Sequence, residues 1–276
     1  MGFAVTYIDG LGQSLGDTYV TADPFYSTGQ VWYVYSGTGV DAADPNGRNP
    51  AKPFATLGYA ISASATYDTI VLMDGHAETI TAAKVPLAGQ TIVGGGSSGG
   101  LPTVKLTMNA AAAGMLTMSA ANVQIRNVWF NANAQANSVA MMTVAGAGAV
   151  IKDCYFQMAQ YDDAAAISIS GNYFRIEGTA FVSTATVLTA QPYMALEVTG
   201  GQGTTLSDVT FDGGTTGFSQ GHAAYIDPGG SAFLMENITL LRGADILVNG
   251  DSPPELTVSG VSASGGGMIR WESAQV

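Results

Sequence analysis

A short phrase recurs six times in this chain of 276 residues, and it constrains the fold more than any other feature. Successive centres of the phrase are 26, 25, 30, 29 and 23 residues apart. Constant internal register with variable spacing is typical of a coil whose loops vary in length while its strands do not. The repeat therefore predicts a solenoid. Its six centres are Asn127, Asp153, Gly178, Asp208, Asn237 and Gly260.

Each phrase alternates apolar and polar residues as a strand does. In VQIRNVWF, Val123 and Ile125 fall on one side and Gln124 and Arg126 on the other. The centres are all Asn, Asp or Gly, the residues that tolerate left-handed backbone geometry, so we expect a bend there. After the bend, one inward column is expected to stack apolar side chains along the coil. Its members are Phe130, Phe156, Phe181, Phe211, Leu240 and Ala263.

The pattern predicts an all-β chain, a single-stranded right-handed parallel β-helix of roughly 7–8 rungs, over residues 41–276. A second alternating segment precedes every phrase, so each repeat should carry at least two strands. A strand edge at the end of a coil needs cover. The apolar spacing of residues 54–65 predicts a short amphipathic helix that caps the N-terminal end.

Residues 1–40 show no repeat register and are rich in aromatic side chains. Since such side chains dominate protein interfaces, one interpretation is a docking arm. The other is an irregular pair of strands packed on the cap. The residues that the first interpretation assigns to docking are Phe25, Tyr26, Trp32, Tyr33 and Tyr35.

Composition excludes several classes of function. Nine basic against 21 acidic residues give a net charge of −12, which argues against nucleic acid and anionic membranes as partners. The only cysteine, Cys154, excludes an internal disulfide and falls on an inward position, where it should act as a small apolar side chain. Charged residues make up only 11% of the chain, which favours a surface of Ser, Thr and Ala or one covered by other subunits.

One stretch resembles a known superfamily. The residues VYSGTGVDAADPNGRNPAKPFATLGYAI, followed by DTIVLMDGHAETIT, are similar to the entry into the β-helix of pectate-lyase-like proteins, in particular small β-helix proteins of tailed bacteriophages. The similarity in pattern covers about residues 33–263, and the motifs lie within about 33–130. The resemblance implies the β-helix fold and a viral origin, and hardly any activity.

Enzymes of that superfamily need three or more charged groups that converge on one groove. The outward column before the bend contains no carboxylate cluster, and Lys152 beside Glu177 predicts an ion pair between neighbouring rungs. We therefore assign no catalytic residue, metal or cofactor. Asp162 and Asp163 are the best candidates for hydrolysis or Ca²⁺ binding, because this acidic doublet falls in a loop.

Two further pairs of side chains are candidate sites. His76 and Glu78 are too few for a zinc site and are expected to order a tight turn on the first rung. Trp129 and Tyr155 form an outward aromatic step over two rungs, which could hold a glycan.

Three functions follow as hypotheses. The first is a virion protein that decorates and stabilises the outer surface of a phage capsid, as a homotrimer with the major capsid protein as partner. The second is a tailspike-type polysaccharide lyase or hydrolase. The third is a surface protein that binds a glycan without cleaving it.

Overall fold

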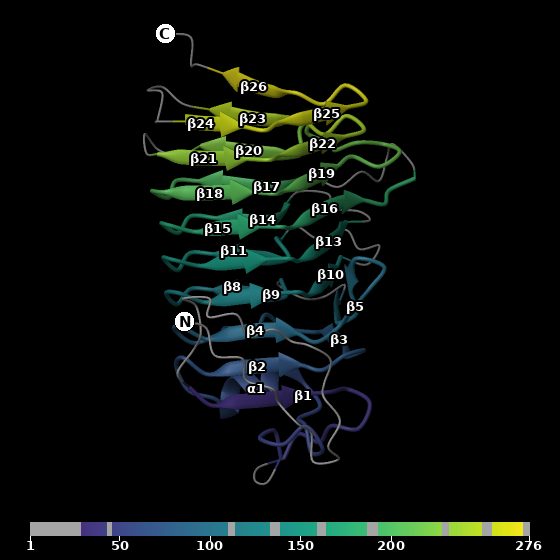
Figure 1. Cartoon of the computed structure of the whole chain (residues 1–276), viewed down its shortest axis with the longest axis vertical. Coiled ribbons are helices and arrows are strands. Elements are labelled where there is room, and N and C mark those ends of the chain that lie inside the picture. Colours follow the sequence, from purple (N-terminus) through teal and green to yellow (C-terminus); the bar gives the residue numbers. More distant parts are fainter. Residues whose placement is uncertain are drawn as a thin grey trace, which may run out of the picture.

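The structure is a parallel β-helix of about seven turns, built from three parallel sheets that run along its long axis (Figure 1). The computed structural model describes residues 29–42, 46–109, 114–132, 139–158, 164–186, 193–227, 232–249 and 256–272. From β9 onward each turn contributes one strand to each sheet in a fixed order. Each of these turns therefore has three strands, which agrees with the prediction that each repeat carries at least two.

Within each sheet, the strands are stacked in the order in which they occur in the sequence. The nine-stranded sheet contains β1 (Val31–Val34), β2 (Thr69–Leu72), β4 (Thr91–Gly94), β9 (Gln124–Arg126), β12 (Val150–Lys152), β15 (Arg175–Glu177), β18 (Thr204–Ser207), β21 (Phe233–Glu236) and β24 (Leu256–Ser259). The eight-stranded sheet contains β3 (Ala77–Ile80), β7 (Lys105–Met108), β10 (Trp129–Asn131), β13 (Tyr155–Met158), β16 (Ala180–Ser183), β19 (Thr210–Asp212), β22 (Thr239–Leu241) and β25 (Ser262–Ser264). The seven-stranded sheet contains β8 (Leu116–Met118), β11 (Met142–Val144), β14 (Ala165–Ile169), β17 (Met194–Thr199), β20 (Ala224–Asp227), β23 (Ile246–Asn249) and β26 (Ile269–Glu272). A two-stranded antiparallel hairpin, β5 (Ser97–Ser98) with β6 (Leu101–Pro102), and the helix α1 (Leu57–Ala63) complete the described elements.

The predicted bend separates the nine-stranded sheet from the eight-stranded one. All six centres of the repeated phrase have a positive φ, between 52° and 63°. An L-residue with a larger side chain would be strained there, which explains why the column holds only Asn, Asp and Gly. Asn127 also donates from Nδ2 to the carbonyls of Gly94 and Gly96, both at 2.8 Å. The column is therefore a structural ladder of turns.

The aromatic column that the sequence predicts is the centre of the core. Phe130, Phe156, Phe181 and Phe211 are fully buried, and they pair in register on neighbouring strands. Their successive ring centroids lie 4.8, 4.9 and 5.2 Å apart with nearly parallel planes. Because parallel strands are about 4.8 Å apart, in-register pairing brings the rings to stacking distance without further adjustment.

The N-terminal turn is closed by the predicted helix, which is shorter than the expected 54–65. Thr56 is the N-cap, and its Oγ1 accepts a hydrogen bond from the N–H of Tyr59. Leu57, Ala60 and Ile61 are buried, and α1 contacts β1 and β2. The helix therefore covers the apolar interior of the first turn.

Residues before position 41 also take part in this turn. β1 pairs in parallel with β2 as the first strand of the nine-stranded sheet. Within it, Trp32 is only 7% exposed, and its indole Nε1 donates to Asp68 at 2.8 Å. Residues 31–34 of the predicted arm are thus a strand of the coil.

The opposite end of the coil is open in the described part of the chain. β24, β25 and β26 are the last strands of the three sheets there. Val258, Val261 and Met268 are 39%, 40% and 48% exposed, and they are three of the ten large apolar side chains exposed among the described residues. In the described part of the chain, a helix therefore covers one end of the β-helix, whereas the other end exposes strand edges and apolar side chains.

We predict that Phe156→Ala destabilises the fold by about 3–5 kcal/mol, because the cavity lies between two stacked rings. Gln157→Ala, on the outward side of the same strand, should change stability by less than about 0.5 kcal/mol. Urea denaturation followed by circular dichroism measures both. Equal losses would contradict the assignment of the column to the core.

A second prediction concerns Asp68, which is 5% exposed and accepts hydrogen bonds from the N–H groups of Gln30 and Ala65 and from the Trp32 indole. Burial alone would raise the pKa of this carboxyl, but the three hydrogen bonds together lower it below its ordinary value. A lowered folded-state pKa gives stability above the unfolded pKa, about 4, that is lost as the pH falls through the folded value. Asp68→Asn should therefore cost about 2 kcal/mol at pH 7 and less at pH 3.

Thermal unfolding of both proteins at several pH values tests this. The difference in melting temperature between wild type and variant should shrink on acidification. A difference independent of pH would show that the Asp68 charge does not stabilise the first turn.

Candidate functional site

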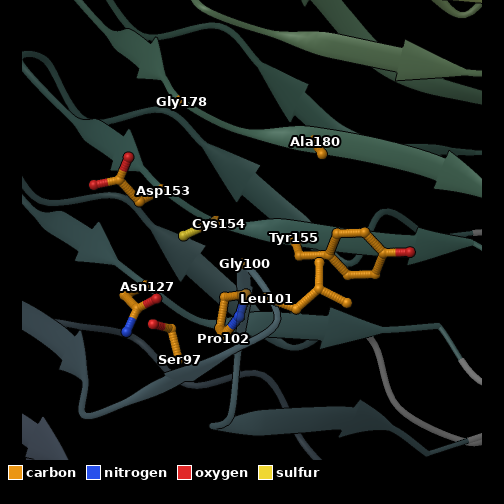
Figure 2. A pocket seen from close by; sticks show the side chains of 10 residues that line it. All are labelled: Ser97, Gly100, Leu101, Pro102, Asn127, Asp153, Cys154, Tyr155, Gly178 and Ala180. Carbon is orange, nitrogen blue, oxygen red and sulfur yellow. The ribbon is translucent and has the colours of Figure 1, made fainter.

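A hollow of about 430 Å³ lies beside the bend on the flank of the coil (Figure 2). The hairpin β5–β6 brings Ser97, Gly100, Leu101 and Pro102 to it. The bend contributes Asn127, Asp153 and Gly178, Cys154 follows the bend, and Tyr155 and Ala180 begin the strands β13 and β16. In Figure 2 the bend residues stand on one side of the hollow and Tyr155 and Ala180 on the other. We call this hollow the flank groove.

The hairpin owes its shape to two glycines. Gly99 and Gly100 have φ values of 60° and 83°, as a two-residue turn with both centres left-handed requires. Two adjacent glycines suit this turn, because glycine adopts a positive φ without strain. What the sequence does not indicate is that Leu101 and Pro102 form a wall of the groove.

Trp129 and Tyr155 are brought together as the sequence predicts. They pair across β10 and β13, and their rings meet edge to face with centroids 5.4 Å apart. Nζ of Lys105 lies 4.6 Å from the centre of the Trp129 ring, a cation–π distance. Both aromatic side chains are partly exposed, and Tyr155 lines the flank groove. The result is a small, partly exposed aromatic platform on two neighbouring strands, with a lysine over one ring.

Titratable groups at the groove are tuned mainly by burial. Burial raises the pKa of Asp153, Glu177 raises it further, and Lys152 and Arg126 oppose the rise. Burial and the charge of Asp212 raise the pKa of Tyr155.

Burial also governs the protonation of the cysteine at this groove. It raises the pKa of the Cys154 thiol to about 12. The thiol is therefore protonated at neutral pH and acts as the small apolar side chain that the sequence predicts.

The charged column before the bend pairs as expected. Nζ of Lys152 lies 3.3 Å from Oε2 of Glu177, and Nη1 of Arg175 lies 3.5 Å from Oε1 of the same residue. One carboxylate, Asp153, lines the flank groove. Glycoside hydrolysis uses two carboxyl groups about 5–9 Å apart across the scissile bond. Among the residues that the structure describes, no group of three or more His, Cys, Asp or Glu side chains could hold a metal ion.

The His76 pair links segments far apart in the sequence, in addition to the tight turn that the sequence predicts there. His76 is fully buried, its Nδ1 accepts from the N–H of Ser36 at 3.0 Å, and its Nε2 lies 3.3 Å from Oε2 of Glu78. Glu78 in turn accepts a hydrogen bond from the N–H of Leu57 at the start of α1. The pair ties the second turn of chain to the capping helix.

Of the seven remaining candidate residues, the structure describes Trp32, Tyr33 and Tyr35. Trp32 lies in the core, where it is not exposed to a partner, because its indole is held by Asp68 and its ring stacks on Phe54 at 5.7 Å. Tyr33 and Tyr35 are partly exposed on the first turn. Phe25, Tyr26, Asp162 and Asp163 lie outside the described residues.

Sequence reasoning missed an ion pair between a buried carboxylate, Asp212, and the largely exposed Arg242. Arg242 donates to both carboxylate oxygens of Asp212, and Asp212 is 7% exposed. Burial would raise the pKa of Asp212, but the hydrogen bonds from Arg242 and from the N–H of Gly214 lower it overall. The two residues are 30 positions apart, and only the stacking of β19 beside β22 brings them together.

We found no significant match to this chain among protein-family models, curated proteins or solved structures. No helix in the described part of the chain is long and apolar enough to cross a membrane.

Proposed function

We propose that this protein is a structural virion protein of a tailed phage, which decorates the outer surface of the capsid as a homotrimer. The open C-terminal end of the described β-helix is the observation that carries the proposal. The viral setting rests on the resemblance of residues 33–130 to small phage β-helix proteins. Attachment through the arm of residues 1–40 stays a prediction.

The C-terminal end offers two kinds of contact to the major capsid protein. The edges of β24, β25 and β26 present backbone N–H and C=O groups, which pair readily with a strand of a partner. Val258, Val261 and Met268 add apolar surface beside these edges. In the described part of the chain α1 covers the other end, and strand edges beside apolar side chains suit a contact with another protein.

The groove favours a second candidate, a surface protein that binds a glycan without cleaving it. Tyr155 and Leu101 supply apolar surface for a sugar ring, and Asp153 and the Asn127 amide supply polar groups beside it. Both functions are compatible with one protein on the outside of a virion.

Capsid attachment predicts that Met268→Lys lowers binding to virions that lack the protein by about a hundredfold, because a charge would be buried without a partner. Val85→Lys is the matched control, since Val85 is also 48% exposed but precedes β4, near the capped end. Sedimentation of labelled protein with such virions measures both, and circular dichroism checks the fold.

The number of copies per virion gives an independent test. Quantitative mass spectrometry should count copies in proportion to the capsid subunits. A few copies per virion, located at the tail, would overturn the decoration role.

Glycan binding predicts that Tyr155→Ala weakens binding of the best ligand from a glycan array by about tenfold, through loss of stacking. Tyr173→Ala is the control, because Tyr173 is 59% exposed and does not line the groove. Isothermal titration measures the two affinities. Equal affinities would exclude the groove, and release of sugar fragments by the wild type would indicate an enzyme instead.

A further inference from the structure

The flank groove is lined by a single side chain that carries a formal charge. Of the ten residues that line it, only Asp153 is acidic and none is basic. Burial raises the pKa values of Cys154 and Tyr155, so both side chains are protonated and neutral at pH 7. Any charge on the lining of the groove is therefore negative.

The Asp153 carboxylate receives no hydrogen bond from the part of the chain that the structure describes. Other polar residues of the bend column are bonded: Asn127 donates to two backbone carbonyls, and Asp208 accepts from Nδ2 of Asn237 at 3.1 Å. Burial raises the pKa of Asp153, because its charged form has lost part of its water. A ligand that donates hydrogen bonds would replace that water.

The basic side chains nearest to Asp153 are engaged elsewhere. Nζ of Lys152 lies 3.3 Å from Oε2 of Glu177, and Arg126 donates to Oε1 of Gln124 at 3.0 Å. The two positive charges lower the pKa of Asp153, but the effect of burial outweighs them. Neither basic residue lines the groove. An acidic ligand would therefore meet Asp153 without a basic partner in the lining.

The backbone N–H groups around the bend are also engaged. Proteins often bind anions with such groups where they point into a concave surface. Here they donate to the neighbouring turns of the coil or to a threonine hydroxyl, so they are not directed to a ligand. They belong to Asn127, Asp153, Cys154, Tyr155, Gly178 and Ala180.

Side-chain acceptors thus dominate the bend side of the groove. The Asp153 carboxylate accepts hydrogen bonds only, and Asn127 presents its amide oxygen because its nitrogen is bonded to backbone. Such a surface suits a ligand rich in donors, as the hydroxyl groups of a sugar are. A ligand carboxylate, which is also an acceptor, does not match it.

Gly178 keeps the Asp153 carboxylate accessible. Its φ is 57°, and a Cβ at this position would collide with Oδ1 of Asp153. An asparagine, which the bend tolerates in other turns, would therefore displace the carboxylate and occupy space beside it. The absence of a side chain in this turn leaves room for a ligand next to Asp153.

We propose that the flank groove selects uncharged sugars over acidic ones, and that Asp153 sets this specificity. The inference rests on the second candidate function, glycan binding at this groove. Adjacent hydroxyl groups of a neutral sugar donate to the Asp153 carboxylate while the ring packs on Tyr155 and Leu101. A uronate adds a like charge and loses the match of donors to acceptors.

An array of matched sugars tests the specificity. It holds neutral hexasaccharides of the common hexoses, each beside its C6-oxidised form, in which a CH₂OH group is replaced by a carboxylate. Isothermal titration at pH 7 then compares the best neutral ligand with its oxidised partner. The neutral form should bind about tenfold more tightly, because a like charge about 5 Å from Asp153 is unfavourable by roughly that factor.

The possible results separate the specificity from glycan binding itself. Equal or tighter binding of the oxidised form would overturn the specificity and leave glycan binding in place. It would point instead to Lys105, which is two strands from Tyr155 in the eight-stranded sheet. If no sugar on the array binds, glycan binding at the groove is overturned and this inference with it.

The variant Asp153→Asn tests the residue. The preference for the neutral form should fall from about tenfold to less than about twofold, because the variant keeps the shape and removes the charge. The fold should persist, since Asn127 and Asn237 occupy the same bend in other turns. Asp208→Asn is the matched control outside the groove and should keep the tenfold preference. An unchanged preference in folded Asp153→Asn would overturn the role of Asp153.

A variant that fills the groove tests the location. Gly178→Asn should weaken binding of the neutral ligand about tenfold, because the new side chain occupies the space beside Asp153. Gly260→Asn is the control, since Gly260 has the same left-handed bend, with φ of 63°, and does not line the groove. Circular dichroism checks both folds. Undiminished binding by folded Gly178→Asn would place the ligand elsewhere and overturn the proposal.

Discussion

In-register stacking of parallel strands is the constraint on which the rest of this structure depends. Since each residue lies about 4.8 Å from its equivalent in the next turn, any property of one position is repeated along the coil. Phenylalanine then stacks on phenylalanine, and a left-handed bend in one turn requires left-handed bends in the others. The same rule pairs Lys152 with Glu177 and sets Trp129 beside Tyr155.

This constraint also explains which features could be predicted from the sequence. The bend column, the phenylalanine column and the Lys152–Glu177 pair were all correctly predicted, because each is a local property read in the register of the repeat. The capping helix was predicted from its apolar spacing, although it is shorter than expected.

Features that depend on contacts outside the register were missed. β1 has no repeat to mark it, and its place as the first strand rests on its pairing with β2, beside which Trp32 bonds to Asp68, 36 residues away. The wall that Leu101 gives to the flank groove depends on how the β5–β6 hairpin folds back beside the coil. Such long-range contacts leave no periodic signal in the sequence, so the site could be predicted only in its aromatic half.

The closed first turn has a consequence for how the molecule is made. α1 and β1 lie early in the chain, so they leave the ribosome before the strands that complete the coil. Once this end is sealed, a growing chain presents a single edge for the next strand, and turns can be added one at a time in the order of synthesis. The helix thus acts as a starting point that gives assembly of the coil a direction.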